Sequence, residues 1–176
     1  VPVAAQAVAA VEADRLKYAQ LKGRSNYLCL KRLVHMRSNP ILTVDEARML
    51  SKALVWIRRT TTGDRGEINL SNRMARAPWD RMSAQGARDC TGVNGACFLR
   101  AARDGASASH IVIVNHSLLL TDLVVGGTLI PDYDVLIVDE AQHLEEEATK
   151  QFGFEVGQRT LHDHFEELNS DRGLLH

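Results

Sequence analysis

The sequence has few of the features that mark membrane or secreted proteins. Its longest apolar stretches, near 111–120 and 135–138, are interrupted by Asn115, His116 and Asp139, whereas a membrane span needs about 20 consecutive apolar residues. The first residues, VPVAAQAVAAVEAD, lack the basic start and continuous apolar centre of a signal peptide. We therefore expect a cytoplasmic protein with no membrane partner.

Acidic residues are scarce in the first half of the chain and abundant in the second. Residues 15–90 hold 16 Lys and Arg against 6 Asp and Glu, whereas residues 91–176 hold 5 against 14. Residues 15–44 contain seven basic residues and no acid. Such a basic half suits a polyanionic partner. The alternative is a solvated helix face whose counter-charges come from the second half of the chain.

Only three cysteines are present, at positions 29, 90 and 97. In a cytoplasmic protein, cysteines are metal ligands or buried thiols more often than disulfides. Cys90 and Cys97 enclose TGVNGA, a Gly- and Asn-containing loop that is able to wrap a metal, and Cys29 comes from a distant segment. Iron–sulfur clusters and zinc ions normally take four ligands. The thiols therefore predict either a metal site that is one ligand short or buried structural residues.

Apolar spacing predicts mainly helices before residue 109. Residues 2–21 read as one helix, and the capping box of Thr43 and Glu46 predicts the start of another. Residues 63–97 show little periodicity, which predicts short helices and loops held by something other than a large core. A short helix is expected over 98–109. The apolar stripe of the capped helix is expected on Val44, Ala47, Leu50, Leu54 and Ile57.

Two β-branched runs, HIVIVN and DVLIVD, are each followed by polar residues and a helical pattern. Continuous apolar strands are typical of a parallel sheet buried on both faces, so the predicted fold class is α/β. Active sites of such sheets lie at the carboxyl ends of the strands.

A pair of carboxylates, Asp139 and Glu140, directly follows the second run. At a strand end, Asp139 can hold the waters of a Mg²⁺ ion and Glu140 can orient a water for attack on a γ-phosphate. Gln142 and His143 add polar groups beside the same crevice. The alternative is a helix start that carries acids because the helix macrodipole favours them.

A phosphate-binding loop of the form G-x-x-x-x-G-K-[ST] is absent from the sequence. That loop supplies the backbone amides and the lysine that cradle nucleotide phosphates. The chain alone is therefore not expected to hydrolyse ATP. Either it is a fragment of a longer ATPase, or the carboxylate pair has another role.

Four stretches, taken in order, resemble the DinG branch of the XPD-like iron–sulfur DNA helicases of superfamily 2. LKGRSNYLC is similar to the segment that delivers that family's first cluster cysteine, and WIRRTTTGDRGEI to its W-x-x-x-T-x-x-G-D stretch. CFLRAARDGASASHIVIVNHSLLLTDL resembles its C-F-x-x-A-R segment and the N-H-x-L-L strand that follows. YDVLIVDEAQHLEEEAT looks like its DEAH box. Together the four stretches cover roughly residues 15–155.

The resemblance implies a mostly helical iron–sulfur-type insertion domain joined to two parallel strands of a RecA-like motor domain. Residues 1–19 would be the helical end of an upstream motor segment and 20–108 the insertion domain. Residues 109–150 would be the motor strands with the Walker B carboxylates, and 151–176 the start of an arch domain. The phosphate loop and the remaining motor domains would lie elsewhere in the full-length chain.

The activity that the resemblance implies is ATP-dependent 5′ to 3′ unwinding of DNA in repair or replication. Single-stranded or forked DNA would be the partner. Mg²⁺ and ATP would bind at Asp139, Glu140 and Gln142. At the position of Gln142 the family usually has His. An iron–sulfur cluster would be the cofactor. The family uses four cluster cysteines, and here the resemblance assigns Cys29, Cys90 and Cys97, with no fourth ligand.

Basic and aromatic residues of the first half are the expected DNA contacts. Basic side chains pair with phosphates without regard to base sequence, and aromatic rings stack on bases or pack in a core. Two other classes of function stay open: a non-catalytic DNA-binding module, and a structural domain that binds zinc through the three cysteines and one histidine. The candidate DNA contacts are Lys22, Arg24, Tyr27, Lys31 and Arg32, with Trp56 and Trp79 as further aromatic candidates.

Overall fold

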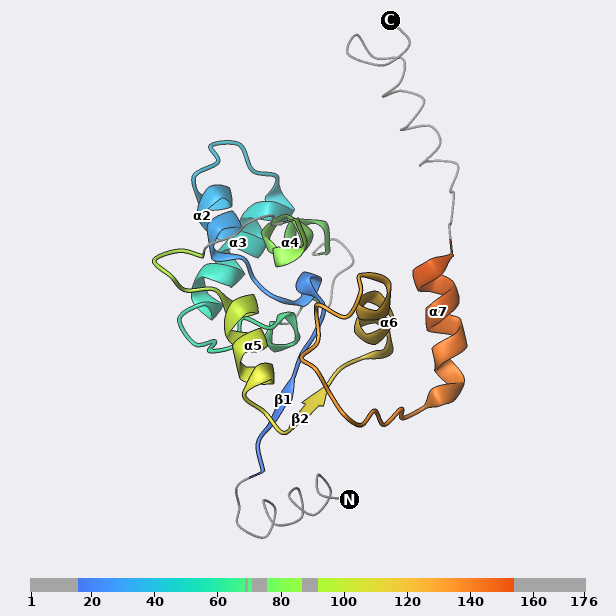
Figure 1. The fold of residues 1–176 in the computed structure, drawn as a ribbon. Coiled ribbons are helices and arrows are strands. Elements are labelled where there is room, and N and C mark those ends of the chain that lie inside the picture. Colours follow the sequence, from blue (N-terminus) through green and yellow to red (C-terminus); the bar gives the residue numbers. More distant parts are fainter. Residues whose placement is uncertain (1–15, 69, 71–75, 87–91, 154–176) are drawn as a thin grey trace, which may run out of the picture. The chain divides into compact units, whose positions relative to one another are not determined.

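The computed structural model describes residues 16–68, 70, 76–86 and 92–153, and the chain divides after Leu136 into two units. No helix in this described part is long and apolar enough to cross a membrane. In chain order the elements of the first unit are β1 (Tyr18–Gln20), η1 (Arg24–Asn26), α2 (Leu30–Arg37), α3 (Val44–Trp56), η2 (Arg65–Glu67), α4 (Arg76–Met82), η4 (Ala84–Gly86), α5 (Phe98–Ser107), β2 (Ile111–Ile113) and α6 (His116–Val124) (Figure 1). The second unit contains η5 (Ala141–His143) and α7 (Leu144–Phe152).

A two-stranded parallel sheet joins the start of the described chain to its middle. β1 pairs with β2, with Tyr18 opposite Ile111 and Gln20 opposite Ile113, and the two strands lie side by side in Figure 1. The α/β class is confirmed at this level. The helix expected over 2–21 is wrong at 18–20, because pairing with a distant strand overrides local helical spacing; residues 2–15 lie outside the described part.

The second expected strand, 135–138, is not a strand in the structure. Among the described residues, β1 and β2 pair only with each other. Val135, Leu136 and Ile137 are exposed, Ile137 to 87%. An apolar run becomes a buried strand only where neighbouring strands supply hydrogen-bond partners. No described strand supplies those partners to this run.

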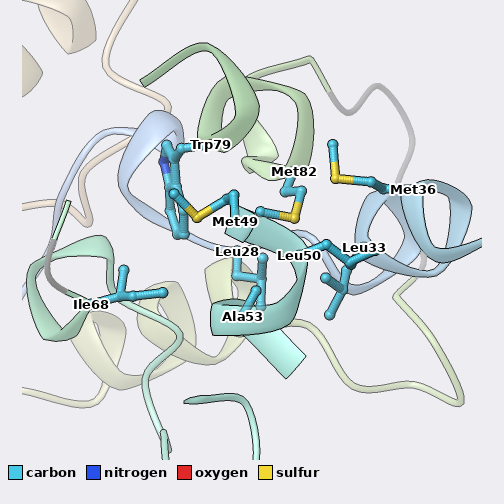
Figure 2. Packing of buried hydrophobic residues seen from close by; sticks show 9 residues of the cluster. All are labelled: Leu28, Leu33, Met36, Met49, Leu50, Ala53, Ile68, Trp79 and Met82. Atoms are coloured by element: carbon cyan, nitrogen blue, oxygen red, sulfur yellow. The ribbon is translucent and has the colours of Figure 1, made fainter. Parts of the chain in front are cut away.

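Helices α2, α3 and α4 pack around one hydrophobic core, the main core cluster. Trp79 and Met82 of α4 are fully buried in it, with Met49 of α3 and Leu28 beside them (Figure 2). Burying side chains of this size contributes about 1.5 to 3 kcal/mol each. Residues 63–97 therefore do contribute to a large core, contrary to the sequence-based expectation. The buried members of the cluster are Leu28, Leu33, Met36, Met49, Leu50, Ala53, Ile68, Trp79 and Met82.

The capping box of α3 forms as predicted. Thr43 Oγ1 accepts from the backbone N–H of Glu46, and a Glu46 carboxylate oxygen accepts from the N–H of Thr43 at 2.8 Å. The other Glu46 oxygen pairs with Arg81 of α4. This pairing allows the charged side chain of Glu46 to be buried. The buried face of the helix therefore differs from the apolar stripe expected from the sequence. The inner face comprises Glu46, Met49, Leu50 and Ala53, while Val44 of the expected stripe is 66% exposed.

Gly63 connects the loop after α3 to two other segments. Its backbone φ is +64°, and its carbonyl accepts from the N–H of Leu28 at 2.9 Å. A Cβ at this position would lie 2.3 Å from the ring of Phe98, the first residue of α5. Only glycine combines this backbone angle with so close an approach of an aromatic ring.

We expect Gly63→Ala to destabilise the first unit more than Gly126→Ala. Both glycines have positive φ, but a Cβ at Gly126 would meet no atom within 4 Å. The backbone strain of about 1 kcal/mol is common to both variants, and the clash with Phe98 adds about 1 to 3 kcal/mol for Gly63 alone. Urea unfolding of the two variants measures the difference. Equal losses would show that the Phe98 ring moves aside without cost.

Candidate functional site

The W-x-x-x-T-x-x-G-D stretch folds into a hydrogen-bonded loop around one carboxylate. Glu67 accepts from Trp56 Nε1 at 3.2 Å and from Thr62 Oγ1. Thr60 Oγ1 accepts from the N–H of Gly63 at 2.8 Å. Burial would raise the pKa of Glu67, but hydrogen bonds from Thr60, Thr62 and Trp56 outweigh it, so the pKa lies below its ordinary value of 4.5. These contacts assign the loop a structural role.

Asp64 joins that loop to the segment after β1. Its carboxylate lies 2.5 Å from Lys22 Nζ and also accepts from the N–H of Gly66 at 2.7 Å. Tyr27 and Asp64 form an antiparallel bridge. One predicted DNA contact, Lys22, is therefore paired with an acid of the same chain, which reduces the charge it presents to a phosphate.

Two of the three aromatic candidates, Tyr27 and Trp79, are buried, and Trp56 is partly buried against the main core cluster. Tyr27 is 3% exposed and its hydroxyl accepts from the N–H of Lys22 at 3.0 Å; desolvation by burial raises its pKa. Trp79 is fully buried and donates to the carbonyl of Ser25 at 2.7 Å. Trp56 lies 6.2 Å from Trp79, ring centre to ring centre. The packing alternative therefore describes these rings, and Tyr27 has no face open for base stacking in this structure.

The remaining basic candidates differ in their surroundings. Arg32 donates from Nη1 to the carbonyl of Ser83 at 3.0 Å and so ties α2 to the end of α4. Lys31 is exposed on α2, and Arg24 is exposed in η1. Arg24 also lines the cavity that contains Cys29 and Cys97, whereas Lys31 does not.

Cys29 and Cys97 line the same cavity although 67 residues separate them in the sequence. Cys29 is the residue before α2 and is buried, and Cys97 is the residue before α5 and is partly exposed. We call this cavity of about 270 Å³ the thiol cavity. Cys90, the third predicted ligand, lies outside the described residues. In the described part of the chain, no group of three His, Cys, Asp or Glu side chains is placed to hold a metal ion.

The loop before Cys97 is a tight turn. Asn94 and Gly95 both have positive φ, +51° and +81°. Val93 and Ala96 exchange two backbone hydrogen bonds, of 3.1 and 2.9 Å. An Asn-Gly pair favours this turn, because both residues adopt the left-handed region readily. The turn fixes the approach of the chain to Cys97.

The carboxylate pair lies in the second unit, just before η5. Asp139 accepts from the N–H of Glu140 at 2.9 Å, and Glu140 adopts a left-handed backbone with φ +48°. Glu140 lies 3.9 Å from His143 Nε2, and both side chains are well exposed. Gln142 is exposed in η5. A non-glycine residue in this region is strained, and such strain concentrates at functional sites.

Curated proteins similar to this chain include several helicases. The ATP-dependent helicase DinG of Mycobacterium tuberculosis is 30% identical over 166 residues, which cover 84% of this chain and 24% of that protein. The ATP-dependent DNA helicase YoaA of Haemophilus influenzae is 36% identical over 162 residues, 87% of this chain and 25% of its own. The 3′-5′ exonuclease DinG of Bacillus subtilis is 32% identical over 161 residues, which cover 89% of this chain and 17% of that protein.

The chain thus spans about a quarter, or less, of the length of these curated relatives. No family model matches it.

We expect Glu67→Gln to destabilise the protein near neutral pH but progressively less in acid. The native pKa of Glu67 is depressed, so its ionised form stabilises the fold above about pH 4.5, and that contribution disappears as the pH falls through the lower native pKa. Urea unfolding of both proteins from pH 7 to pH 3 measures the difference. Thr62→Val removes one hydrogen-bond donor to Glu67 and should reduce the difference in unfolding free energy between the proteins with and without Glu67→Gln. A difference that does not change with pH would contradict the assignment.

Proposed function

We propose that this chain is a segment of an ATP-dependent DNA helicase of the DinG and YoaA kind. The supporting observation is similarity to proteins with those names at 30 to 36% identity over 84 to 89% of this chain. Unwinding from 5′ to 3′ in DNA repair or replication, in the cytoplasm, belongs to the same proposal. Because the chain spans a quarter of such proteins, the activity would reside in a longer protein that contains the remaining motor domains.

In that protein, the residues around η5 would face the nucleotide. Asp139 would hold Mg²⁺ through water, Glu140 would orient the attacking water, and Gln142 would hydrogen-bond a neighbouring motor segment. The left-handed backbone of Glu140 supports this assignment, because such a backbone is uncommon for a residue other than glycine and concentrates at functional sites. The run 135–138 would become a strand there by pairing with motor strands that the described residues do not include.

An iron–sulfur cluster at the thiol cavity is part of the proposal. Its support is that Cys29 and Cys97 converge on one cavity from the starts of two helices. Helix starts favour the negative charge of thiolate ligands. The described residues fit two of the four usual ligands, and Cys90 is the candidate for a third. When bound, such a cluster would cross-link α2 and α5.

The longer protein should hydrolyse ATP, and single-stranded DNA should stimulate the rate. Glu140→Gln in that protein is expected to lower kcat by about 100-fold or more while leaving ATP binding intact, because only the water-orienting group is lost. Turnover is measured by phosphate release and binding by a fluorescent nucleotide.

Glu145→Gln is the matched control, because it removes an exposed acid from the first turn of α7. Normal hydrolysis by Glu140→Gln would remove Glu140 from the mechanism. Absence of any ATP hydrolysis by the longer wild-type protein would overturn the helicase proposal.

A further inference from the structure

Asp122 is a buried acid in the last turn of α6 that the proposed mechanism does not use. Only 3% of its surface is exposed. The carbonyl end of a helix opposes negative charge, because the helix macrodipole is negative there. Burial of a carboxylate is also costly unless hydrogen bonds replace its water. Asp122 therefore depends on hydrogen-bond partners outside its own helix.

Those partners are backbone N–H groups that follow α6. One carboxylate oxygen of Asp122, Oδ1, accepts from the N–H of Leu129 at 2.6 Å and from that of Ile130 at 3.2 Å. The N–H of Gly127 donates to the backbone carbonyl of Asp122 at 2.8 Å. Gly126 and Gly127 have positive φ, +83° and +73°, which suits a tight turn. We call the two bonds to Oδ1 the Asp122 clamp.

Packing fixes Ile130 as well. Its side chain is buried in a core cluster with Leu118 and Leu119 of α6. Pro131 follows directly, and its ring fixes its own φ and favours an extended backbone at Ile130. The chain therefore leaves the clamp with little conformational freedom.

The clamp lies between β2 and the run 135–138. β2 passes into α6 through Asn115, whose side chain accepts from the N–H of Leu118 at 3.0 Å. α6 is therefore fastened at its start by Asn115 and at its end by the clamp. Only residues 131–134 separate Ile130 from the run 135–138. A strand, a helix and a second apolar run in this order match the crossover between parallel strands.

A short connection makes the position of Ile130 decisive for strand register. Side chains of a strand alternate between faces, so a shift of one residue moves each side chain about 3.3 Å and to the opposite face. In the longer protein, the register of the run 135–138 would set where Asp139 and Glu140 emerge at its end. The connecting residues 131–134 leave little slack to absorb a displacement of Ile130.

We propose that Asp122 is a positioning residue for the carboxylate pair. By holding Ile130, it sets the register in which the run 135–138 joins the sheet of the longer protein, and with it the position of Asp139 and Glu140. The inference rests on the proposed function, because the strand and the role of the pair belong to that proposal. Asp122 acts only through the backbone that leads to the pair.

Hydrogen exchange in the longer protein tests the register directly. Asp122→Ala should speed exchange of the Leu129 and Ile130 amides about tenfold or more, because their acceptor is lost. The amides of 135–138 should exchange slowly in the wild-type protein and about tenfold faster in the variant, although no residue of that run is changed. Mass spectrometry of the peptides that cover the two segments measures both rates.

ATP hydrolysis by the same protein gives the second readout. Asp122→Ala should lower kcat roughly 10- to 100-fold, because misplacement of reacting groups by about 1 Å has effects of this size. The affinity for a fluorescent nucleotide should change less than about twofold, which separates positioning from binding. The Mg²⁺ concentration that gives half the maximal rate should rise, because Asp139 is displaced. Asp122→Asn keeps an oxygen that can accept both bonds and should restore most of kcat.

Two control variants separate positioning from lost stability. Asp132→Ala makes the same substitution at an exposed acid of the connection and should leave kcat within about twofold of the wild-type value. Met36→Ala opens a cavity in the main core cluster and should lower the unfolding temperature. At temperatures where it is folded, Met36→Ala should keep its kcat.

A glycine inserted between Asp132 and Tyr133 tests the same point without altering the clamp. An exposed connection tolerates one additional residue at small cost in stability, so this variant is expected to fold even if Asp122→Ala does not. It should lower kcat and speed exchange over 135–138, because the additional residue releases the register.

Wild-type kcat and wild-type exchange over 135–138, in folded Asp122→Ala or in the insertion variant, would overturn the positioning role. An equal loss of kcat in Met36→Ala would also overturn it, because stability alone would then explain the loss. If the longer wild-type protein hydrolyses ATP, these outcomes leave the proposed function standing. A longer wild-type protein without ATP hydrolysis would overturn the proposed function, and exchange over 135–138 would then decide the register alone.

Discussion

The fit of Phe98 against the backbone of Gly63 determines how the distant segments of the first unit meet. Gly63 also accepts a hydrogen bond from Leu28, and a Cβ at position 63 would overlap the Phe98 ring. Cys29 follows Leu28, and Cys97 precedes Phe98. One glycine therefore brings both thiols to the same cavity, and the same fit sets α5 against the segment after β1. The candidate metal site depends on it.

Local chemistry made part of the fold predictable. The Thr43 capping box needs only residues within one helical turn, and the run at 111–113 forms a strand as its β-branched residues indicate. The predictions failed where the structure depends on contacts between residues that are distant in the sequence. Glu46 is buried because it pairs with Arg81, which turned the expected face of α3. The run 135–138 lacks a described strand to pair with, so its composition alone did not make it a strand.

The candidate site was predictable as a set of residue types rather than as an arrangement. The sequence predicted either a metal site or buried thiols, and two of the three cysteines, Cys29 and Cys97, line one cavity. The basic bias of the chain ends before α5, so only the fold shows that Arg103 lines the same cavity as Arg24. Tyr27 is an aromatic residue of the kind that stacks on bases, but the hydrogen bond from the N–H of Lys22 and the surrounding apolar side chains keep it buried.

Cys29 and Cys97 line one cavity, and the proposal that both are ligands of an iron–sulfur cluster is decided by the iron and sulfide content of the protein. The measurement needs protein purified without oxygen, together with a visible spectrum. If the cluster is present, we expect stoichiometric iron and sulfide and a broad brown absorption, both lost in Cys29→Ser and Cys97→Ser. Protein without iron, in which all three cysteines react with a thiol reagent after unfolding, would contradict it. Zinc in place of iron would also contradict it and indicate a structural zinc site.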